Sequence, residues 1–211
     1  MARRNHSQDA TLAHVQLETL RTDLWRWTAP HPDWRPTGDD GTPTSWPQDV
    51  GCVLYVTTDH AVFIDPLAPA DDGSFWVWAD ERCRDRDVAV LETIPFHRRS
   101  RDAFVERYSA ATKPPSPVDA LPFALGDETM YWLVEHRALV PGDLLVAGED
   151  GELSLCPEPW LDHLSAKPSL AAAREALTAL LELDIDLVLT SHGGPVREGG
   201  RDALARALAP A

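Results

Sequence analysis

The sequence predicts an α+β fold in which two mixed β-sheets pack face to face and helices cover both outer surfaces, a four-layer αββα sandwich. Three observations support this. Strand-like segments dominate residues 14–65, a strand–helix order follows to residue 108, and a second β-rich block precedes a closing helix–strand–helix series. A chain of 211 residues suits one core, so we expect a single domain over residues 1–211, with residues 1–13 disordered.

In the first half, alternating or continuous apolar residues mark the predicted strands, which cover residues 14–20, 24–28, 52–57, 61–65 and 87–93. A helix is expected over residues 73–84, where Phe75, Trp76 and Ala79 share one side. A second helix is expected directly after Ser100, whose side chain is placed to cap it.

In the second half, the predicted strands cover residues 128–134, 138–141 and 144–147, with a short edge strand at 153–156. Leucine and alanine at helical spacing predict the clearest helix of the chain over residues 170–183. A buried strand through residues 187–189 and a last helix over residues 203–208 complete the order.

Residues 29–48 form a long predicted loop that is rich in Pro, Asp, Gly and Thr and carries Trp34 and Trp46. A loop of this length in a compact domain usually has a function or is poorly ordered. Two interpretations remain open, a lid over a pocket or a surface loop pinned by two aromatic side chains. We place Trp34 and Trp46 near the pocket mouth, as substrate-binding residues.

The composition limits the class of partner. The 34 acidic and 19 basic residues give a net charge of −15, which repels phosphate backbones and anionic lipid. We therefore expect a small-molecule ligand or substrate, no nucleic acid and no membrane, and the oligomeric state stays open. The start of the chain lacks an apolar signal-peptide core. Three widely spaced cysteines, Cys52, Cys83 and Cys156, suit buried thiols in a reducing compartment, so the expected location is the cytoplasm.

The most informative segment is DLVLTSHGGPV at residues 186–196, a short buried strand that leads to His192 and then to Gly193 and Gly194. In open α/β sheets, ligands bind just beyond the carboxyl ends of the strands. Glycines without Cβ let the backbone approach a ligand closely. The segment favours either a functional His192 or a structural histidine in a tight turn.

Four landmarks in this order resemble the metallo-β-lactamase fold superfamily over residues 14–208. They are AVFIDPL at 61–67, VLETIPFHRRS at 90–100, ALVPGDLLV at 138–146 and VLTSHGGPV at 188–196. The resemblance implies an αββα sandwich of metallo-β-lactamase type. It also implies that Asp65 closes an early strand, that Asp143 corresponds to a metal-bridging carboxylate and that His192 corresponds to a metal ligand.

The sequence departs from the family at its metal-binding motif, His-x-His-x-Asp-His. No residue at the corresponding positions is a usual zinc ligand, because isoleucine and phenylalanine have no donor atom and arginine stays cationic. Residues 119–129 also lack the histidine that the family has before the following strand. The departure predicts that the two-metal site, and with it the metal cofactor, has been lost. The four motif positions fall on Ile94, Phe96, Arg98 and Arg99.

His97 stands within the altered motif, and two interpretations of it remain. It can join Asp143 and His192 in a set of two histidines and one carboxylate that suits one zinc or iron ion. Alternatively, it donates to the nearby helix or to solvent and touches no metal. Arg98 and Arg99 favour the second interpretation, because cations oppose a divalent ion and are able to pair with Asp143 or an acidic substrate instead.

The sequence therefore predicts a divergent protein on a hydrolase scaffold, either a binding protein or a metal-independent enzyme. In the second case His97, Asp143, His192 and Glu92 are the candidates for proton transfer. The alternative is a metal-dependent hydrolase with the reduced site His97, Asp143 and His192, acting on an ester, amide, thioester or phosphoester.

Two structural expectations follow from the loss of metal. Ile94 and Phe96 should pack into the space that metal ligands occupy in relatives. Asp143 and His192 should meet directly or through Arg98 or Arg99, and the carboxylate should raise the pKa of His192.

Overall fold

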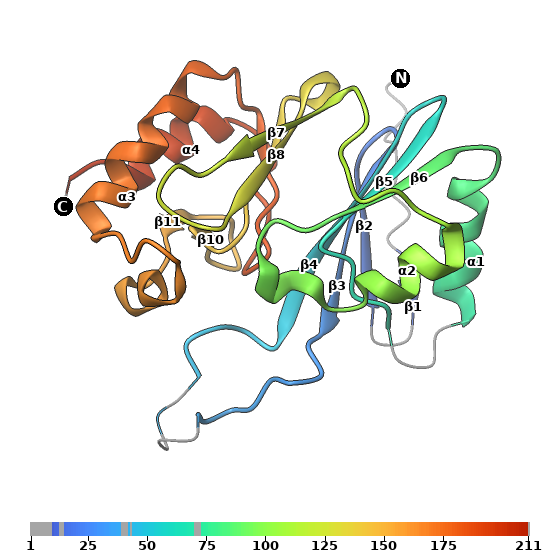
Figure 1. Ribbon diagram of the computed structural model, residues 1–211, viewed down its shortest axis with the longest axis horizontal. Coiled ribbons are helices and arrows are strands. Elements are labelled where there is room, and N and C mark those ends of the chain that lie inside the picture. Colours follow the sequence, from blue (N-terminus) through green and yellow to red (C-terminus); the bar gives the residue numbers. More distant parts are fainter. Residues whose placement is uncertain (1–9, 13–14, 39–41, 43, 70–72, 211) are drawn as a thin grey trace, which may run out of the picture.

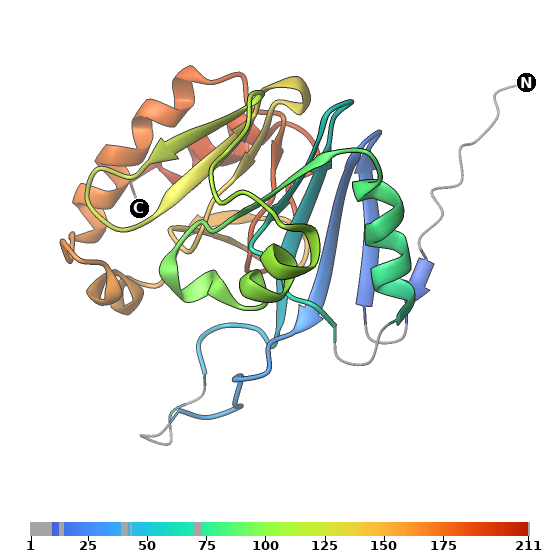
Figure 2. The ribbon, with the colours of Figure 1, turned by 45° about the vertical axis from the view of Figure 1, so that its right-hand side comes forward.

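The computed structural model describes residues 10–12, 15–38, 42, 44–69 and 73–210. Its two larger sheets pack face to face (Figures 1 and 2), with α1 and α2 outside one sheet and α3 and α4 outside the other. The predicted αββα sandwich is confirmed.

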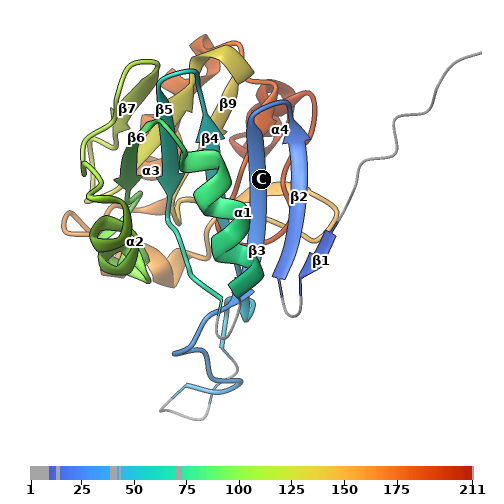
Figure 3. The same cartoon turned by 90° about the vertical axis from the view of Figure 1, so that its right-hand side faces the viewer.

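The first sheet has six strands in sequential order, β1 to β6. Neighbours are antiparallel except β5 and β6, which are parallel and are joined through α1. A parallel pair needs such a crossover. Helices α1 and α2 both lie on the outer face of the first sheet (Figure 3). The elements are β1 (Ala10–Leu12), β2 (Val15–Arg21), β3 (Leu24–Pro30), β4 (Asp49–Val56), β5 (His60–Ile64), α1 (Gly73–Cys83), β6 (Asp87–Leu91), the 3₁₀ turn η1 (Pro95–Arg98) and α2 (Arg101–Tyr108).

The second sheet has the order β12-β9-β8-β7, with β12 parallel to β9, and β10 and β11 form a separate pair. The carboxyl ends of β9 and β12 therefore lie side by side. The elements are β7 (Val118–Pro122), β8 (Thr129–Leu133), η2 (Val134–His136), β9 (Ala138–Val140), β10 (Leu145–Ala147), β11 (Leu153–Leu155), η3 (Glu158–His163), α3 (Leu170–Leu177), η4 (Thr178–Glu182), β12 (Leu187–Val188) and α4 (Gly200–Ala207).

Three apolar clusters lie between the four layers. Successive strand residues face opposite sides, so Phe63 packs with Trp27 under α1 and α2, whereas Ile64 faces the second sheet. Leu139 lies in the third cluster, which fills the space between the second sheet and α3 and α4.

Several local expectations need correction. Residues 10–12, expected to be disordered, form β1, while the rest of residues 1–13 lies outside the described residues. Strand β7 was not predicted. The helix expected over residues 170–183 is α-helical only to Leu177 and continues as a 3₁₀ helix. Ser100 does not cap α2 with its side chain, because its Oγ instead accepts a hydrogen bond from the Ala68 amide.

The three cysteines are buried and free, as predicted. Among the described residues, no helix is long and apolar enough to cross a membrane.

Candidate functional site

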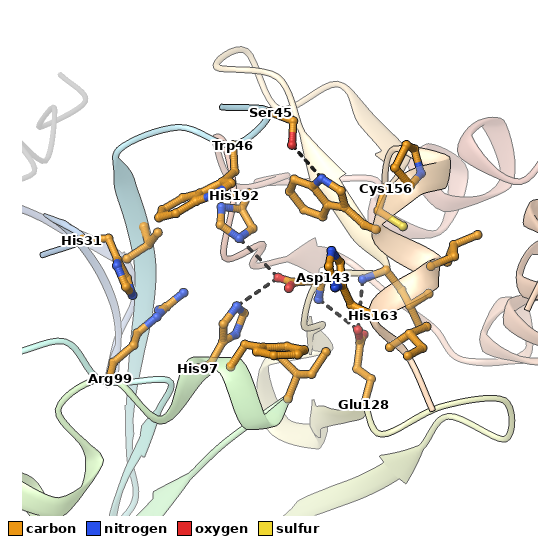
Figure 4. Close-up of a pocket in the computed structure, with 18 of the residues that line it drawn as sticks. His31, Ser45, Trp46, His97, Arg99, Glu128, Asp143, Cys156, His163 and His192 are labelled. Carbon is orange, nitrogen blue, oxygen red and sulfur yellow. Dashed lines mark hydrogen bonds and ion pairs between the residues drawn. The ribbon is translucent and has the colours of Figure 1, made fainter. Parts of the chain in front are cut away.

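A pocket of about 620 Å³ opens at the edge of the sandwich where β6, β9 and β12 end. Its walls are largely apolar and include Trp46, Trp160 and Leu161, while polar side chains gather at its base (Figure 4). A concave, mostly apolar site with a few convergent polar groups is the usual form of a small-molecule site.

Three of these polar side chains converge from three different loops. His97 lies in η1 after β6, Asp143 lies between β9 and β10, and His192 follows β12. Asp143 Oδ1 is 2.9 Å from His97 Nε2 and 3.2 Å from His192 Nε2 (Figure 4). One potential metal-ligand atom from each of the three residues lies within 4.8 Å of the other two.

The Oδ1 atom of Asp143 is buried, yet neither imidazole approaches it with the geometry of a hydrogen bond. Burial raises the pKa of this carboxyl, but His192 and His97 outweigh burial and hold the pKa well below its usual range. Asp143 is therefore a buried carboxylate that two neighbouring imidazoles hold in its charged form, although neither directs an N–H at Oδ1.

Asp65 stands behind His97. Its Oδ2 is 2.9 Å from His97 Nδ1 and accepts a hydrogen bond from the Thr93 hydroxyl at 2.5 Å, while its Oδ1 accepts one from the Thr93 amide at 2.8 Å. This network assigns a proton to Nδ1 and directs Nε2 at Asp143. Burial alone lowers the pKa of His97, but the carboxylates of Asp65 and Asp143 outweigh it and raise the pKa to about 9.

His192 has a different environment. Its ring contacts the edges or faces of Trp46 and Trp160, at centroid distances of 5.8 and 5.3 Å, and its buried Nδ1 has no hydrogen-bond partner among the described residues. Burial lowers the pKa of His192 and outweighs the opposing effect of Asp143, while His97 lowers it further. The predicted approach of His192 and Asp143 is confirmed, but the predicted rise in the pKa of His192 is wrong.

Glu128 fixes the loop that carries Asp143. Its carboxylate accepts hydrogen bonds from the amides of Gly142, Asp143 and Leu144, at 3.0, 2.9 and 3.0 Å. Burial raises the pKa of Glu128 to about 8, although the amide donors act in the opposite direction. The side chain holds the backbone on both sides of Asp143 in place.

The described chain resembles solved metallo-β-lactamases along most of its length. A metallo-β-lactamase from Erythrobacter litoralis matches with a TM-score of 0.57 and 17% identity, covering 96% of this chain and 94% of that one. FIM-1 from Pseudomonas aeruginosa, in a mono-zinc form, matches with a TM-score of 0.57 and 11% identity over 92% and 94%. DIM-1 exposed to ceftazidime matches with a TM-score of 0.59 and 11% identity over 94% and 98%. No protein-family model and no curated protein matches the sequence.

The chain has the metallo-β-lactamase fold.

On this metallo-β-lactamase fold, the two arginines after His97 do not pair with Asp143 as the sequence suggested. Arg98 is exposed and forms an ion pair with Asp102 at 2.7 Å. Arg99 lines the pocket, and its guanidinium donates to the carbonyls of Gly51 and Asp65 and to the Ser191 hydroxyl. Arg98 is paired by the helix that follows, and the terminal nitrogens of Arg99 are engaged by carbonyls and a hydroxyl, while its buried Nε has no hydrogen-bond partner among the described residues.

The other sequence-predicted site residues divide between the pocket and the surface. Ile94 is 3% exposed and lines the pocket, but Phe96 is 62% exposed at its rim, so the expectation that Phe96 fills the core is wrong. Trp46 lines the pocket. Trp34 is not among the residues that line it and donates from Nε1 to the Trp46 carbonyl at 3.0 Å. Glu92 also lies outside the lining and pairs with Arg101 at 3.2 Å.

Sequence reasoning missed the partners behind the converging side chains, namely Asp65 as the hydrogen-bond acceptor of His97, Glu128 and Trp160. The four-residue spacing of Thr93 and His97, together with a strand ending in Asp-Pro, was the available signal for the first. No local pattern pointed to Glu128, because the amides that donate to its carboxylate lie fourteen residues or more along the chain.

Proposed function

We propose that this protein is a hydrolase that holds a single divalent metal ion through His97, Asp143 and His192. The observation that carries the proposal is the approach of two imidazole Nε2 atoms to the buried Oδ1 of Asp143, with one ligand atom from each residue lying within 4.8 Å of the others. Two histidines and one carboxylate with open positions suit zinc or ferrous iron.

The environment of His97 supports this donor set. Histidine ligands of metals usually donate their second ring N–H to a carboxylate or carbonyl, which fixes the tautomer and the ring orientation. The Asp65 carboxylate, 2.9 Å from His97 Nδ1, has this role. Because the pKa of His97 is raised to about 9, the ion has to displace a proton from Nε2, and its affinity should increase with pH.

One ion rather than two follows from the sequence at the altered motif. Ile94 and Phe96 offer no donor atom, and Arg98 and Arg99 are cations whose guanidinium groups are engaged elsewhere. FIM-1 and an Erythrobacter litoralis enzyme, both similar in fold, are described in mono-zinc forms. A site of one ion is therefore compatible with this scaffold.

When bound, the ion supplies Lewis acidity that polarises a carbonyl or phosphoryl oxygen and makes water a better nucleophile. The chain contributes the rest. Trp46 and Trp160 contact His192 and offer apolar surface for a substrate, and the pocket of about 620 Å³ suits a small molecule. Asp65 holds His97 in one orientation. The substrate class is an ester, amide, thioester or phosphoester with an apolar group.

A second candidate is a metal-independent enzyme or a binding protein. The opposite pKa shifts of His97 and His192 favour it, since they give one protonated and one neutral imidazole at neutral pH, with ring centroids 5.9 Å apart. Such a pair is suited to general acid–base chemistry.

Metal titration of the purified chain, stripped with a chelator, separates the two candidates. We expect about one Zn²⁺ per chain, d–d absorption with Co²⁺, and hydrolysis of chromogenic esters or thioesters that depends on the ion. Asp143→Asn and His192→Gln should lose the ion. His163→Gln is the matched control, because His163 lines the same pocket outside the cluster.

Two results would contradict the proposal. Two tightly bound ions per chain would show that the four altered positions do not limit the site. No binding at micromolar Zn²⁺, with hydrolysis retained, would favour the metal-independent candidate.

A further inference from the structure

Arg26 is a buried cation without an acidic partner. It lies in β3, is 6% exposed, and forms no ion pair with a carboxylate in the part of the chain that the structure describes. Its Nη2 atom instead donates to the backbone carbonyls of Thr190, at 3.1 Å, and Gly193, at 2.6 Å. Burying an arginine costs free energy, and its buried Nε has no hydrogen-bond partner among the described residues, so the contacts to the two carbonyls have to offset that cost.

The two carbonyls lie on either side of Ser191 and His192. The same loop is tied from the first sheet by the Gly51 amide, which donates to the Ser191 carbonyl at 2.7 Å, and by Arg99, which donates to the Ser191 hydroxyl. The backbone from residue 190 to 193 is thus held at several points, and Arg26 joins its two ends through a single guanidinium nitrogen. Within the loop itself, the Thr190 hydroxyl also donates to the Gly194 carbonyl at 3.2 Å.

Gly51 makes room for this contact. A Cβ atom at Gly51 would lie 2.6 Å from Arg26 Nη2 and 2.7 Å from the Thr190 oxygen, which is too close for either. The reach of Arg26 to the loop therefore depends on the absence of a side chain at position 51.

We propose that Arg26 is a positioning residue for His192, holding the 190–193 loop so that His192 Nε2 faces Asp143. The proposal rests on the proposed function, in which His192 is a metal ligand. Groups that orient a ligand from behind typically change metal affinity by about 10- to 100-fold when they are removed.

The first test uses the metal-free protein. The amides of Gly51 and Ala147 donate to the carbonyls of Ser191 and His192, at 2.7 and 3.0 Å, so their hydrogen exchange reports on the loop. In Arg26→Met we expect both to exchange at least about tenfold faster, while the Val56 amide in β4 keeps its rate. The ¹⁵N signals of the His192 ring should shift in the same variant.

The second test measures Zn²⁺ affinity by competition with a chromophoric chelator. Arg26→Met should bind Zn²⁺ about 10- to 100-fold more weakly and alter the Co²⁺ spectrum. Arg26→Lys should recover part of the affinity, since an ammonium also donates to two carbonyls but from a shorter side chain. Arg82→Met is the control, because Arg82 is also partly buried but packs on Trp25 and Trp78, away from the pocket.

Gly51→Ala provides a second route that leaves Arg26 in place, with Gly73→Ala as its control, since a Cβ at Gly73 meets nothing within 4 Å. It should reproduce the faster exchange and the weaker Zn²⁺ binding, and it decides the matter if Arg26→Met does not fold.

Wild-type exchange at Gly51 and Ala147 together with wild-type Zn²⁺ affinity would overturn the proposal, and so would faster exchange with unchanged affinity. If the wild-type protein binds no Zn²⁺, the proposed function fails on its own, and the ring signals of His192 then decide whether Arg26 positions that side chain.

Discussion

His97 follows a strand of the first sheet and His192 follows a strand of the second, and both meet the same carboxylate oxygen, yet their protonation differs. Their Nε2 atoms lie 2.9 and 3.2 Å from Asp143 Oδ1, and both rings are buried. The pKa of His97 is raised to about 9, whereas the pKa of His192 is lowered.

The difference arises behind the rings. Burial lowers the pKa of both, but His97 has Asp65 at Nδ1, while Nδ1 of His192 has no partner among the described residues and the ring lies against Trp46 and Trp160. The second carboxylate thus decides which ring carries the proton. A charged His97 then opposes a second charge on His192.

The largest effect should come from removing that second carboxylate. Asp65→Asn leaves the Asp143 carboxylate but removes the charge behind His97 and replaces one of the two acceptor oxygens that His97 and Thr93 use with an NH₂ donor. Breaking a buried pair on one side typically costs about 3–5 kcal/mol. We expect a loss of that size in the free energy of unfolding of the metal-free protein, measured by urea denaturation.

Asp102→Asn is the control, since Asp102 is exposed and pairs with Arg98 on the surface, so its loss should cost less than about 1 kcal/mol. Equal destabilisation by the two variants would show that Asp65 is not what distinguishes His97 from His192.

A second prediction concerns the pH dependence of stability in the metal-free protein. The pKa of His97 is higher in the folded than in the unfolded chain, where it is about 6.5, so its stabilising contribution is complete below about pH 6.5 and is lost as the pH rises through about 9. A shift of this size corresponds to on the order of 3 kcal/mol. Urea denaturation at about pH 6 and pH 10 should show a larger loss in the wild type than in His97→Gln, by about that amount, since Glu128, whose pKa is raised to about 8, contributes to the loss in both proteins.

NMR titration of the two rings sharpens the same comparison. His192 should titrate below its ordinary value and His97 above it, and Asp143→Asn should lower both, since the carboxylate raises the pKa of each. A His192 that titrates above His97 would reverse the assignment of the proton.

The sequence predicted the fold through the order of its elements and its resemblance to the metallo-β-lactamase superfamily. The position of His192 at a strand end pointed to that residue, and the resemblance pointed to Asp143. The order of strands and helices is set by periodicity, and Asp143 and His192 follow buried strands whose carboxyl ends meet in a parallel pair. His97 was recognised only as a possibility, since its direction depends on the 3₁₀ turn η1 at Pro95. The charge state of His192 depends on Asp65 and His97, which are 127 and 95 residues away in the chain, and no local pattern reports such contacts.

The smallest effect concerns the two apolar residues that flank the same turn. The sequence placed both Ile94 and Phe96 in the pocket floor, and on that basis Phe96→Ala should cost about 3–5 kcal/mol. In the structure, Ile94 is 3% exposed and belongs to the core cluster of the second sheet, whereas Phe96 is 62% exposed, with its ring 6.2 Å from that of His163. The turn rotates His97 inward, and this leaves its neighbour Phe96 outside.

We therefore expect Ile94→Val to lower the free energy of unfolding by about 0.5–1.5 kcal/mol. Phe96→Ala, although it removes far more apolar surface, should stay within about 0.5 kcal/mol of the wild type. Urea denaturation of both variants checks this order, and a larger loss for Phe96→Ala would mean that η1 faces the other way and that His97 does not point at Asp143.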